Sequence, residues 1–324
     1  MKKILITGAC GFIGSHLTEI MAEKGFKVVA FDRYNINNDY GHLENSKLKN
    51  KIEVKLGDLR DFDSVLNALD GCHAVFHLGA LIGIPYSYVS PLAYIKTNIE
   101  GTYNILEASR IKKIKQIIIT STSETYGSAQ HVPIDEYHPK VGQSPYAASK
   151  IAADQLAVSY YKSFNLPIKI ARPFNTYGPR QSARAIIPTI ISQILNKNKT
   201  LNLGNLNPTR DFTFVTDTCN GLIEIFNSNK LFGQEINIGS NNEISILDLA
   251  KKIKKIMKSE IKIKTSKLKK RPKDSEVDRL VCNNNYITQK TNWRVKTNID
   301  KGINETIKWI KQNKEMFKSK NYNI

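Results

Sequence analysis

The chain has 324 residues, enough for one large or two smaller domains with an adequate core. Its hydrophobic content of 41% is typical of globular proteins, and no apolar run approaches the roughly 18 residues of a membrane span. The formal net charge of +19 would favour binding of a nucleic acid or of a small anionic nucleotide, and the charge alone does not distinguish these two ligands. Because the lysines are spread along the chain, we expect no nucleic-acid partner and no membrane partner.

The N-terminus and the cysteines narrow the class of protein further. The apolar run after Met1 ends at Gly8 without a cleavage-like site, so we read it as a buried strand and expect a cytoplasmic protein. The cysteines are scattered and lack metal-type spacing, which predicts neither disulfides nor a metal site. They are Cys10, Cys72, Cys219 and Cys282.

Short apolar runs alternate with amphipathic stretches over the first two-thirds of the chain. The runs at 3–7, 27–32, 52–55, 74–77, 116–120 and 168–171 predict buried strands, and the stretches at 12–23, 62–69, 94–110 and 146–164 predict helices. This alternation predicts an α/β fold, a Rossmann-like doubly wound parallel sheet with helices on both faces. Ligands of such sheets bind beyond the carboxyl ends of the strands.

The pattern loosens after Arg172. Helices are expected at 186–196, 217–226, 246–257 and 299–313, and short strands at 213–215, 235–238 and 261–265. We therefore predict a dinucleotide-binding domain at 1–172 and a smaller mixed α/β substrate lobe at 173–324, with the chain free to cross back between them. Substrate would lie in the cleft between the two.

A glycine-rich loop follows the first strand and opens the first helix. Gly8, Gly11 and Gly14 allow a tight turn and a close approach to a pyrophosphate at the helix N-terminus. Asp32 ends the second strand, where a carboxylate accepts hydrogen bonds from a ribose and favours NAD over NADP; Arg33 beside it is the residue that would receive a 2′-phosphate. Further predicted cofactor contacts are Cys10, Phe12, Ile13, Asp58, Leu59, Leu78, Gly79 and Ala80, with a helix N-cap at Asp58 or Asp61 as the alternative for that stretch.

Two groups of side chains predict acid–base chemistry. Tyr146 and Lys150 lie four apart on one helix face, where an ammonium group would stabilise the tyrosinate and make it a usable base. Thr122, Ser123 and Glu124 directly follow the strand at 116–120. Together they predict an oxidising site with a second acid–base group, although Glu124 alone would be equally at home on the surface.

These residues together resemble the extended short-chain dehydrogenase/reductase family that acts on nucleotide sugars, over nearly the whole chain. Residues 7–14 are similar to its cofactor loop, Tyr146 and Lys150 to its catalytic pair, and Thr122 to its Ser/Thr position. The resemblance implies NAD, a nucleotide-diphosphate sugar substrate and a homodimer through the helices at 94–110 and 146–164. It also adds Asn98 and Pro173 to the cofactor site.

The resemblance further implies a substrate site. Residues 172–180 look like the segment that passes the nicotinamide and reaches the sugar diphosphate, which makes Asn175 and Arg180 candidates. Arg210 and Arg271 resemble positions whose arginines hold the diphosphate, a role for which a planar guanidinium is suited. Tyr86 and Arg184 lie in two further segments, 80–88 and 180–188, that resemble a subgroup of the family.

That subgroup is the 4,6-dehydratases of legionaminic acid pathways, which are similar to GDP-N-acetylglucosamine dehydratase. Segments 142–146 and 275–280 fit it too, while the Thr-Ser-Glu triplet resembles both GDP-mannose-type dehydratases and UDP-glucuronate decarboxylases. The implied reaction begins with C4 oxidation, in which Thr122 positions the sugar, Tyr146 takes the hydroxyl proton and Lys150 lowers the tyrosine pKa. Glu124 then removes the C5 proton, Ser123 or Glu124 helps the C6 hydroxyl to leave as water, and hydride returns to C6.

Three other readings stay open. A UDP-glucuronate decarboxylase would need a cationic pocket for the C6 carboxylate, for which Arg184 is a candidate. A 4-epimerase or C4 oxidoreductase would need only Tyr146 and Lys150. A non-catalytic nucleotide-sensing protein on the same fold would have no chemical need for that pair.

Overall fold

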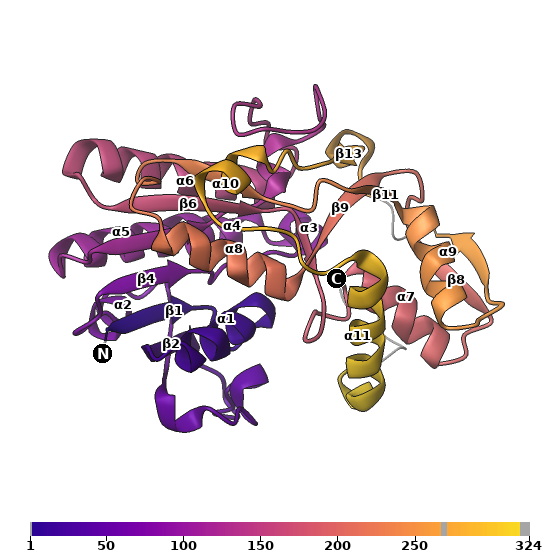
Figure 1. Ribbon diagram of the computed structural model, residues 1–324, viewed down its shortest axis with the longest axis horizontal. Coiled ribbons are helices and arrows are strands. Elements are labelled where there is room, and N and C mark those ends of the chain that lie inside the picture. The colour runs from indigo at the N-terminus through magenta and orange to yellow at the C-terminus, as the bar shows by residue number, and fades with distance from the viewer. Residues whose placement is uncertain (1, 267–270, 318–324) are drawn as a thin grey trace.

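A seven-stranded parallel sheet forms the centre of the N-terminal half of the molecule (Figure 1). The computed structural model describes residues 2–266 and 271–317. The strand order is β10-β6-β5-β4-β1-β2-β3, so the direction of winding reverses between β1 and β4, where the carboxyl ends of such sheets bind ligands. The strands are β1 (Lys3–Thr7), β2 (Lys27–Arg33), β3 (Ile52–Gly57), β4 (Ala74–His77), β5 (Gln116–Thr120), β6 (Ile168–Pro173) and β10 (Glu235–Ile238).

Helices cover both faces of this sheet because successive strand side chains point to opposite faces. On one face Ile4 and Ile6 pack with α1 (Phe12–Glu23) and α8 (Val215–Asn227). On the other face, Leu5 lies in a second cluster with residues of three further helices. These are α2 (Phe62–Ala68), α5 (Gly101–Ile111) and α6 (Pro145–Phe164).

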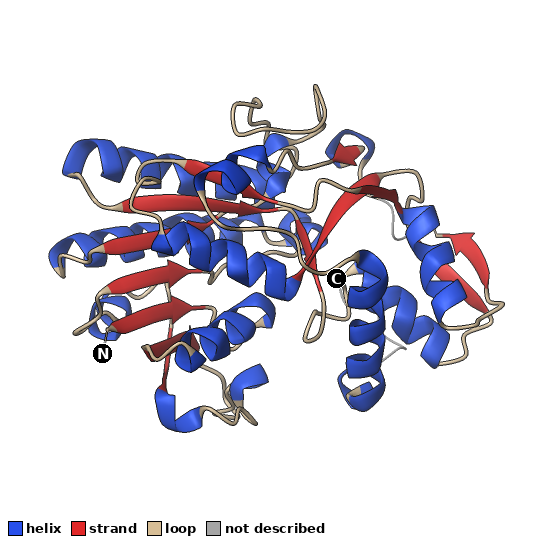
Figure 2. Ribbon diagram, viewed as in Figure 1, coloured by secondary structure: helices blue, strands red, loops and turns tan. Residues whose placement is uncertain are grey.

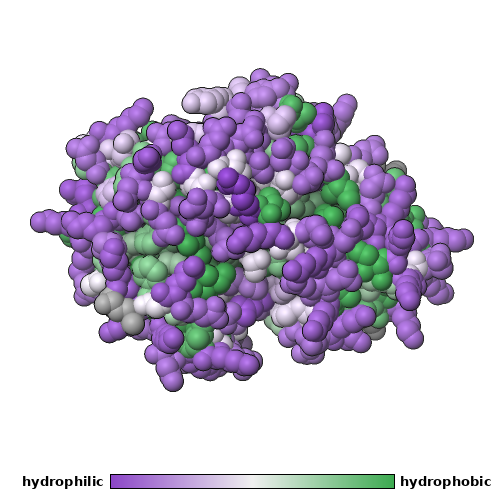
Figure 3. Space-filling model, viewed as in Figure 1, coloured by the Kyte–Doolittle hydropathy of each residue, from purple (hydrophilic) through white to green (hydrophobic). Residues whose placement is uncertain are grey.

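The C-terminal part builds smaller sheets and helices beside the main sheet (Figure 2). β9 pairs with β7, β11 and β13, and β12 pairs with β8. The face of the molecule in Figure 3 is mostly hydrophilic, with apolar side chains in scattered smaller areas. The elements are β7 (Asn175–Tyr177), α7 (Ile186–Leu195), β8 (Thr200–Leu203), β9 (Thr209–Phe214), β11 (Glu243–Ser245), α9 (Ile246–Ile256), β12 (Lys262–Thr265), β13 (Arg279–Leu280), α10 (Asn285–Lys290) and α11 (Ile299–Gln312).

All six strands predicted for the first two-thirds are confirmed, and so are the sheet type and the four C-terminal helices. The helix predicted at 94–110 begins differently, because α4 (Pro91–Tyr94) passes into the π-helical turn η3 (Ile95–Glu100) before α5 starts. Prediction missed α3 (Ile84–Val89), α10 and the short strands β7, β8, β11 and β13, which carry too few residues for a periodic signal. The division at residue 172 stays a prediction; β10 belongs to the main sheet through β6.

Candidate active site

The glycine loop after β1 is packed so tightly that side chains are excluded. A Cβ on Gly14 would lie 2.0 Å from the carbonyl oxygen of Gly8, and Gly8 itself has a φ of +67°. A Cβ on Gly8 would also lie 2.9 Å from the backbone of Gly79, which follows β4. No side chain caps the N-terminus of α1, where the N-cap is Gly11. Its free amides are therefore available to an anion.

The end of β2 is tied to this loop. The carboxylate of Asp32 accepts the backbone N–H of Cys10 at 2.7 Å and that of Arg33 at 2.7 Å. Burial raises the pKa of the Cys10 thiol to about 12, and Asp32 adds to the effect, so this cysteine stays a neutral small side chain. Phe12 and Ile13 form the first turn of α1.

A buried hydrogen-bond chain joins β1 to β4 at the same edge. The hydroxyl of Thr7 accepts the N–H of Gly79 at 3.0 Å and contacts Nδ1 of His77 at 2.8 Å, while Nε2 of that ring lies 3.1 Å from Thr102. Burial lowers the pKa of His77 to about 3, so the ring is neutral and serves the fold. The chain fixes Leu78, Gly79 and Ala80 beside the glycine loop.

The remaining predicted cofactor residues have partners within the protein. Asp58 pairs with Arg60 at 2.5 Å, and Asp61 caps α2, as the alternative reading of this stretch predicts. Leu59 packs against Gly79, where a Cβ would lie 2.8 Å from its side chain. Pro173 is buried at the end of β6.

Asn98 lies in the π-helical turn η3 and is almost fully buried. Its amide nitrogen donates to Leu81 O and to Ser149 Oγ, both at 2.9 Å, and its oxygen accepts Leu81 N at 2.8 Å. The side chain therefore joins the segment after β4 to α6. In this structure it positions those two elements, and its predicted contact with the cofactor stays a prediction.

The Tyr146 and Lys150 side chains project from the first turns of α6, both buried. Burial raises the pKa of Tyr146, a hydrogen bond with Thr122 acts in the opposite direction, and the charge of Glu124 adds to the rise. The ammonium of Lys150 donates to the carbonyl oxygen of Thr120 at 2.7 Å. In this structure Lys150 therefore contacts the end of β5, and its predicted effect on the tyrosine pKa stays a prediction.

A buried ion network behind Lys150 was not predicted. Asp154, one helical turn further along α6, accepts hydrogen bonds from Arg172 at 2.8 Å and from Ser121 at 2.6 Å. Burial lowers the pKa of Lys150, and the charge of Asp154 opposes this. In the sequence, this network is indicated only by the spacing of Asp154 four residues after Lys150, which places both side chains on one helix face.

Thr122, Ser123 and Glu124 follow β5 in a single turn, η4 (Ser123–Tyr126). Thr122 is its N-cap and accepts the N–H of Glu124 at 3.3 Å. Ser123 is buried, whereas the Glu124 side chain keeps 12% exposure and lies 3.6 Å from the guanidinium of Arg271. The predicted second acid–base group is therefore largely withdrawn from the surface, and its charge contributes to raising the pKa of Tyr146.

Two of the predicted substrate arginines meet next to Glu124. Arg210 is on β9, and its guanidinium lies 3.6 Å from Glu276, matching the distance from Arg271 to Glu124. Burial lowers the pKa of Arg210, the charge of Glu124 opposes this, and Arg271 adds to the lowering. Both pairs are longer than a hydrogen bond. Nη1 of Arg210 donates to Thr209 O at 2.8 Å, whereas Nη1 of Arg271 has no hydrogen-bond partner among the described residues and is available to a ligand.

The other predicted substrate residues are divided. The amide nitrogen of Asn175 is buried without a hydrogen-bond partner among the described residues, which suits a ligand contact. Tyr86 is partly exposed, and its ring centroid lies 6.2 Å from that of Tyr94. Arg184 is exposed, and its positive charge opposes the rise in the pKa of Tyr94 that burial causes. Arg180 pairs with Glu19 on α1 at 2.8 Å, and its predicted contact with the diphosphate stays a prediction.

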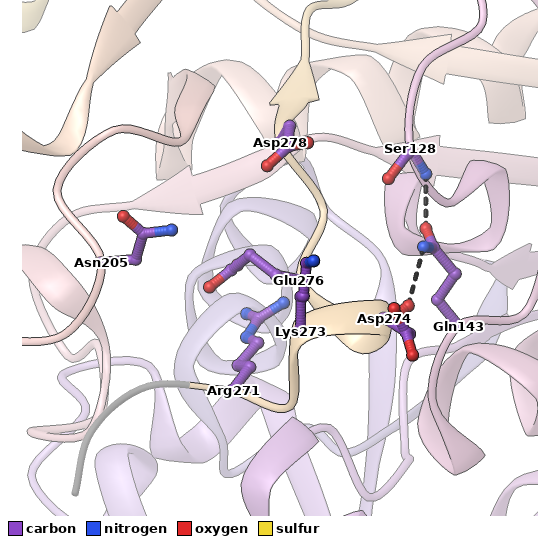
Figure 4. A pocket seen from close by; sticks show the side chains of 8 residues that line it. All are labelled: Ser128, Gln143, Asn205, Arg271, Lys273, Asp274, Glu276 and Asp278. Carbon is purple, nitrogen blue, oxygen red and sulfur yellow. Dashed lines mark hydrogen bonds between the residues drawn. The ribbon is translucent and has the colours of Figure 1, made fainter. Parts of the chain in front are cut away.

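A cavity of about 610 Å³ opens beside Arg271, the one predicted substrate residue among the described residues that line it (Figure 4). Its lining is polar and carries charges of both signs. The carboxylate of Glu276 and the guanidinium of Arg271 lie together in its middle (Figure 4). The lining residues are Ser128, Gln143, Asn205, Arg271, Lys273, Asp274, Glu276 and Asp278.

Comparison with known proteins gives consistent matches along the chain. The profile of the family described as GDP-mannose 4,6 dehydratase matches residues 5–306. A dTDP-D-glucose 4,6-dehydratase of Bos taurus is 29% identical over 321 residues, covering 96% of this chain and 89% of the relative. A UDP-N-acetyl-alpha-D-glucosaminuronate decarboxylase of Bacillus cytotoxicus is 33% identical over 270 residues, covering 81% and 82%.

A solved structure agrees with the fold. The UDP-glucuronic acid 4-epimerase of Bacillus cereus, in complex with UDP-glucuronic acid and NAD, superposes with a TM-score of 0.89 and 28% identity. The match covers 96% of this chain and 99% of that one. Within the described ranges, 2–266 and 271–317, no helix has the length and apolar character to cross a membrane.

Proposed function

Because this chain belongs to the GDP-mannose 4,6 dehydratase family, we propose that it is an NAD-dependent nucleotide-sugar 4,6-dehydratase. Its product would be a nucleotide-linked 4-keto-6-deoxy-hexose, and GDP-N-acetylglucosamine is the substrate that we would test first. The observation that carries the proposal is the position of Glu124, held in the same turn as Thr122 and close enough for its charge to act on Tyr146.

The residues at the sheet edge fit NAD. The uncapped amides at the start of α1 suit a pyrophosphate, and the tight loop at Gly8 and Gly14 leaves the backbone exposed to it. Asp32 stands at the end of β2, where a carboxylate receives the adenosine ribose hydroxyls. NAD, when bound, supplies the hydride acceptor for C4 and the hydride donor for C6.

The proton transfers fall to the residues of α6 and η4. Tyr146 Oη takes the proton of the C4 hydroxyl, and Thr122 Oγ hydrogen-bonds the same sugar oxygen. Glu124 then takes the C5 proton, which the 4-ketone acidifies. The C6 hydroxyl leaves as water with a proton from Ser123 or from Glu124. General acid–base groups of this kind contribute about 10² to 10⁴-fold each.

The diphosphate of the substrate would lie between Arg210, Arg271 and Asn175. Arg210 is nearly buried, and the buried amide nitrogen of Asn175 lacks a partner among the described residues. Planar guanidinium groups bind phosphate through two parallel hydrogen bonds, and their contacts to Glu124 and Glu276 are long enough to exchange.

A decarboxylase acting on UDP-glucuronate is the second candidate. Arg184 supports it, because its charge reaches Tyr94, whose ring centroid lies 6.2 Å from that of Tyr146. A cation at this point would attract the C6 carboxylate of a uronic acid. The same catalytic residues would oxidise C4, and CO₂ would leave in place of water.

Mass spectrometry separates these candidates. The protein is incubated with NAD⁺ and, separately, with GDP-N-acetylglucosamine, UDP-N-acetylglucosamine, GDP-mannose and UDP-glucuronate. Loss of one water from a hexose supports the dehydratase and names its substrate, whereas loss of CO₂ from the uronate supports the decarboxylase. If the masses of all four nucleotide sugars stay unchanged, both the dehydratase and the decarboxylase candidates are contradicted. The next test would then be NMR, which detects inversion at C4.

Glu124→Gln tests the base assignment. The variant keeps the size of the side chain and removes its charge, so NAD binding should be unchanged while water loss falls about 10² to 10⁴-fold. Glu305→Gln, on the exposed side of α11, is the matched control and should retain the activity. Dehydration by Glu124→Gln at the wild-type rate would show that another group takes the C5 proton.

We also propose that the protein forms a homodimer through α5 and α6. Large apolar side chains are exposed on these helices and on the turns before them, which a second copy would cover. Sedimentation velocity should give the mass of two chains. A monomer at micromolar concentration would reject this assembly. The exposed side chains are Leu92, Ile95, Tyr103 and Phe164.

A further inference from the structure

Gln143 forms hydrogen bonds with two segments from other parts of the molecule. It lies in the loop before α6, three residues before Tyr146. Its side-chain oxygen accepts the N–H of Ser128 at 2.5 Å, and its side-chain nitrogen donates to Asp274 O at 3.0 Å (Figure 4). Its backbone carbonyl accepts the hydroxyl of Ser275 at 2.5 Å. Three segments that are distant in sequence thus meet at one residue.

Each of these segments carries a residue of the proposed site. Ser128 follows Glu124 by four positions, and Gln143 precedes Tyr146. Ser275 ends the turn η6 (Lys273–Ser275), with Arg271 before it and Glu276 directly after it. The contacts of Gln143 therefore connect the acid–base residues of the N-terminal half to an arginine of the C-terminal part.

Ser275 has a second partner that leads back to Tyr146. Since its hydroxyl donates to Gln143, its oxygen accepts the hydroxyl of Tyr88, 2.6 Å away. The ring of Tyr88 packs against the cluster of Ile84, Tyr94 and Tyr146. Ser275 is only 9% exposed, so these hydrogen bonds are protected from water.

The Gln143 side chain, which also lines the cavity, packs closely against Gly127. Gly127 has a φ of +64°, and a Cβ there would lie 2.7 Å from the Gln143 side-chain oxygen. A glycine at this position lets the Gln143 amide reach Ser128. The arrangement is therefore built around this one glutamine.

We propose that Gln143 and Ser275 are positioning residues, joined with Tyr88 in a latch that sets the distance between Arg271 and the pair Tyr146 and Glu124. The proposal rests on the proposed function, in which a single substrate contacts the arginine with its diphosphate and the acid–base residues with its sugar. Displacements of about 1 Å between such groups are enough to slow a reaction strongly. The latch therefore affects turnover only of a substrate that contacts both Arg271 and the pair Tyr146 and Glu124.

Ser275→Ala tests the latch because it removes both hydroxyl contacts without adding atoms. We expect kcat on the nucleotide sugar to fall about tenfold, the size of one lost buried hydrogen bond. The dissociation constants of UDP, GDP and dTDP, measured by calorimetry, should change less than about threefold, because these probes contact the arginine end alone. Ser159→Ala, which removes a local hydroxyl contact to Leu156 O on α6, is the control and should change neither quantity.

Two kinetic outcomes would overturn the proposal. The first is an unchanged kcat in Ser275→Ala, and the second is an equal loss in kcat and in nucleoside-diphosphate affinity, which would indicate a collapsed binding site. If Ser275→Ala does not fold, Tyr88→Phe removes one contact of the same latch, and the same split should appear at smaller size.

Hydrogen exchange tests the latch independently of activity. The N–H of Ser128 is protected by the Gln143 side chain, so Ser275→Ala should speed its exchange through the loosened glutamine. If the Ser128 N–H exchanges at the same rate in Ser275→Ala as in the wild type, the latch is rejected, even when the enzyme proves to be a dehydratase. Conversely, a wild-type protein that turns over none of the four sugars rejects the proposed function, while faster exchange in the variant still supports the latch.

Discussion

The two ends of the site are built in different ways. At the cofactor end, the glycine loop, the end of β2 and the segment after β4 hold one another through short hydrogen bonds such as Cys10 N to Asp32 at 2.7 Å. At the substrate end, Arg210 and Arg271 face carboxylates at 3.6 Å. The amide nitrogen of Asn175 has no partner there among the described residues.

This difference shows which contacts the fold supplies and which a ligand must supply. A buried polar group without a partner costs free energy, about 1–3 kcal/mol, and a ligand that pairs with the group recovers this cost. The cofactor end holds its strand ends together through these internal hydrogen bonds, and the uncapped amides at the start of α1 are left for a ligand. The substrate end has donors in reserve, and its ligand should stabilise the fold measurably.

The largest expected effect is on kcat, because the reaction needs the cofactor and the substrate to be held together at the two ends of the site. Tyr146→Phe removes only the hydroxyl, and kcat should fall about 10² to 10⁴-fold because the C4 proton loses its acceptor. NAD and nucleoside-diphosphate affinities should stay within about threefold, as measured by calorimetry. Tyr137→Phe, at an exposed tyrosine, serves as the control. A Tyr146→Phe variant that keeps its turnover number would remove this tyrosine from the mechanism.

The cofactor end can be broken alone. Gly14→Ala would bring a Cβ to 2.0 Å from Gly8 O, so the loop must open and the NAD dissociation constant should rise about 100-fold. Gly25→Ala, where the added Cβ meets nothing within 4 Å but φ is +89°, controls for glycine loss itself. The affinity for UDP, GDP and dTDP should be unaffected. An equal loss for NAD and for these nucleotides would mean that the two ends are not separable.

The substrate end can be broken alone by Arg271→Ala. Loss of a charged hydrogen-bond donor costs about 1.5–3 kcal/mol, which predicts a roughly 10- to 100-fold weaker binding of the nucleoside diphosphate. NAD affinity should not change. Arg279→Ala, which removes the exposed pair with Glu243, is the matched control. Equal nucleotide affinity in the Arg271 variant and the wild type would exclude this arginine from the diphosphate site.

The smallest effect concerns stability at the cofactor end. The pKa of His77 is lowered to about 3 by burial, against an ordinary value near 6.5 in the unfolded chain. The unfolded chain therefore takes up the proton first, and stability should fall as the pH drops from about 6.5 towards 3. His77→Gln should flatten this fall by about 1–2 kcal/mol between pH 7.5 and pH 5, measured by urea unfolding. His131→Gln, at an exposed position, should keep the wild-type slope.

The cofactor end was predictable because its signals are local. Buried runs such as Lys3–Thr7 and Ala74–His77 are continuous in sequence, and parallel strands bring their carboxyl ends to one edge without further information. Gly8 and Gly14 are recognised by their spacing alone. The confirmed strands and the tight glycine loop follow from these short-range rules.

The substrate end was only partly predictable because its contacts are between distant segments. Nothing near Gln143 in sequence indicates that it meets Ser275, 132 positions later. Arg180, a predicted substrate residue, pairs with Glu19 in the fold, and no local pattern indicates that pairing. A side chain's residue type predicts what it can bind, while the tertiary fold decides what it does bind.

The return of the chain to the main sheet affects how the protein is made. β10 completes the sheet by pairing with β6, although more than sixty residues separate the two strands along the chain. During synthesis on the ribosome, β6 therefore leaves the exit tunnel well before its neighbour does, and its open edge is exposed to other chains in the meantime. A nascent chain stopped between residues 174 and 234 would carry this unpaired edge, which makes that interval the one in which a chaperone would protect it best.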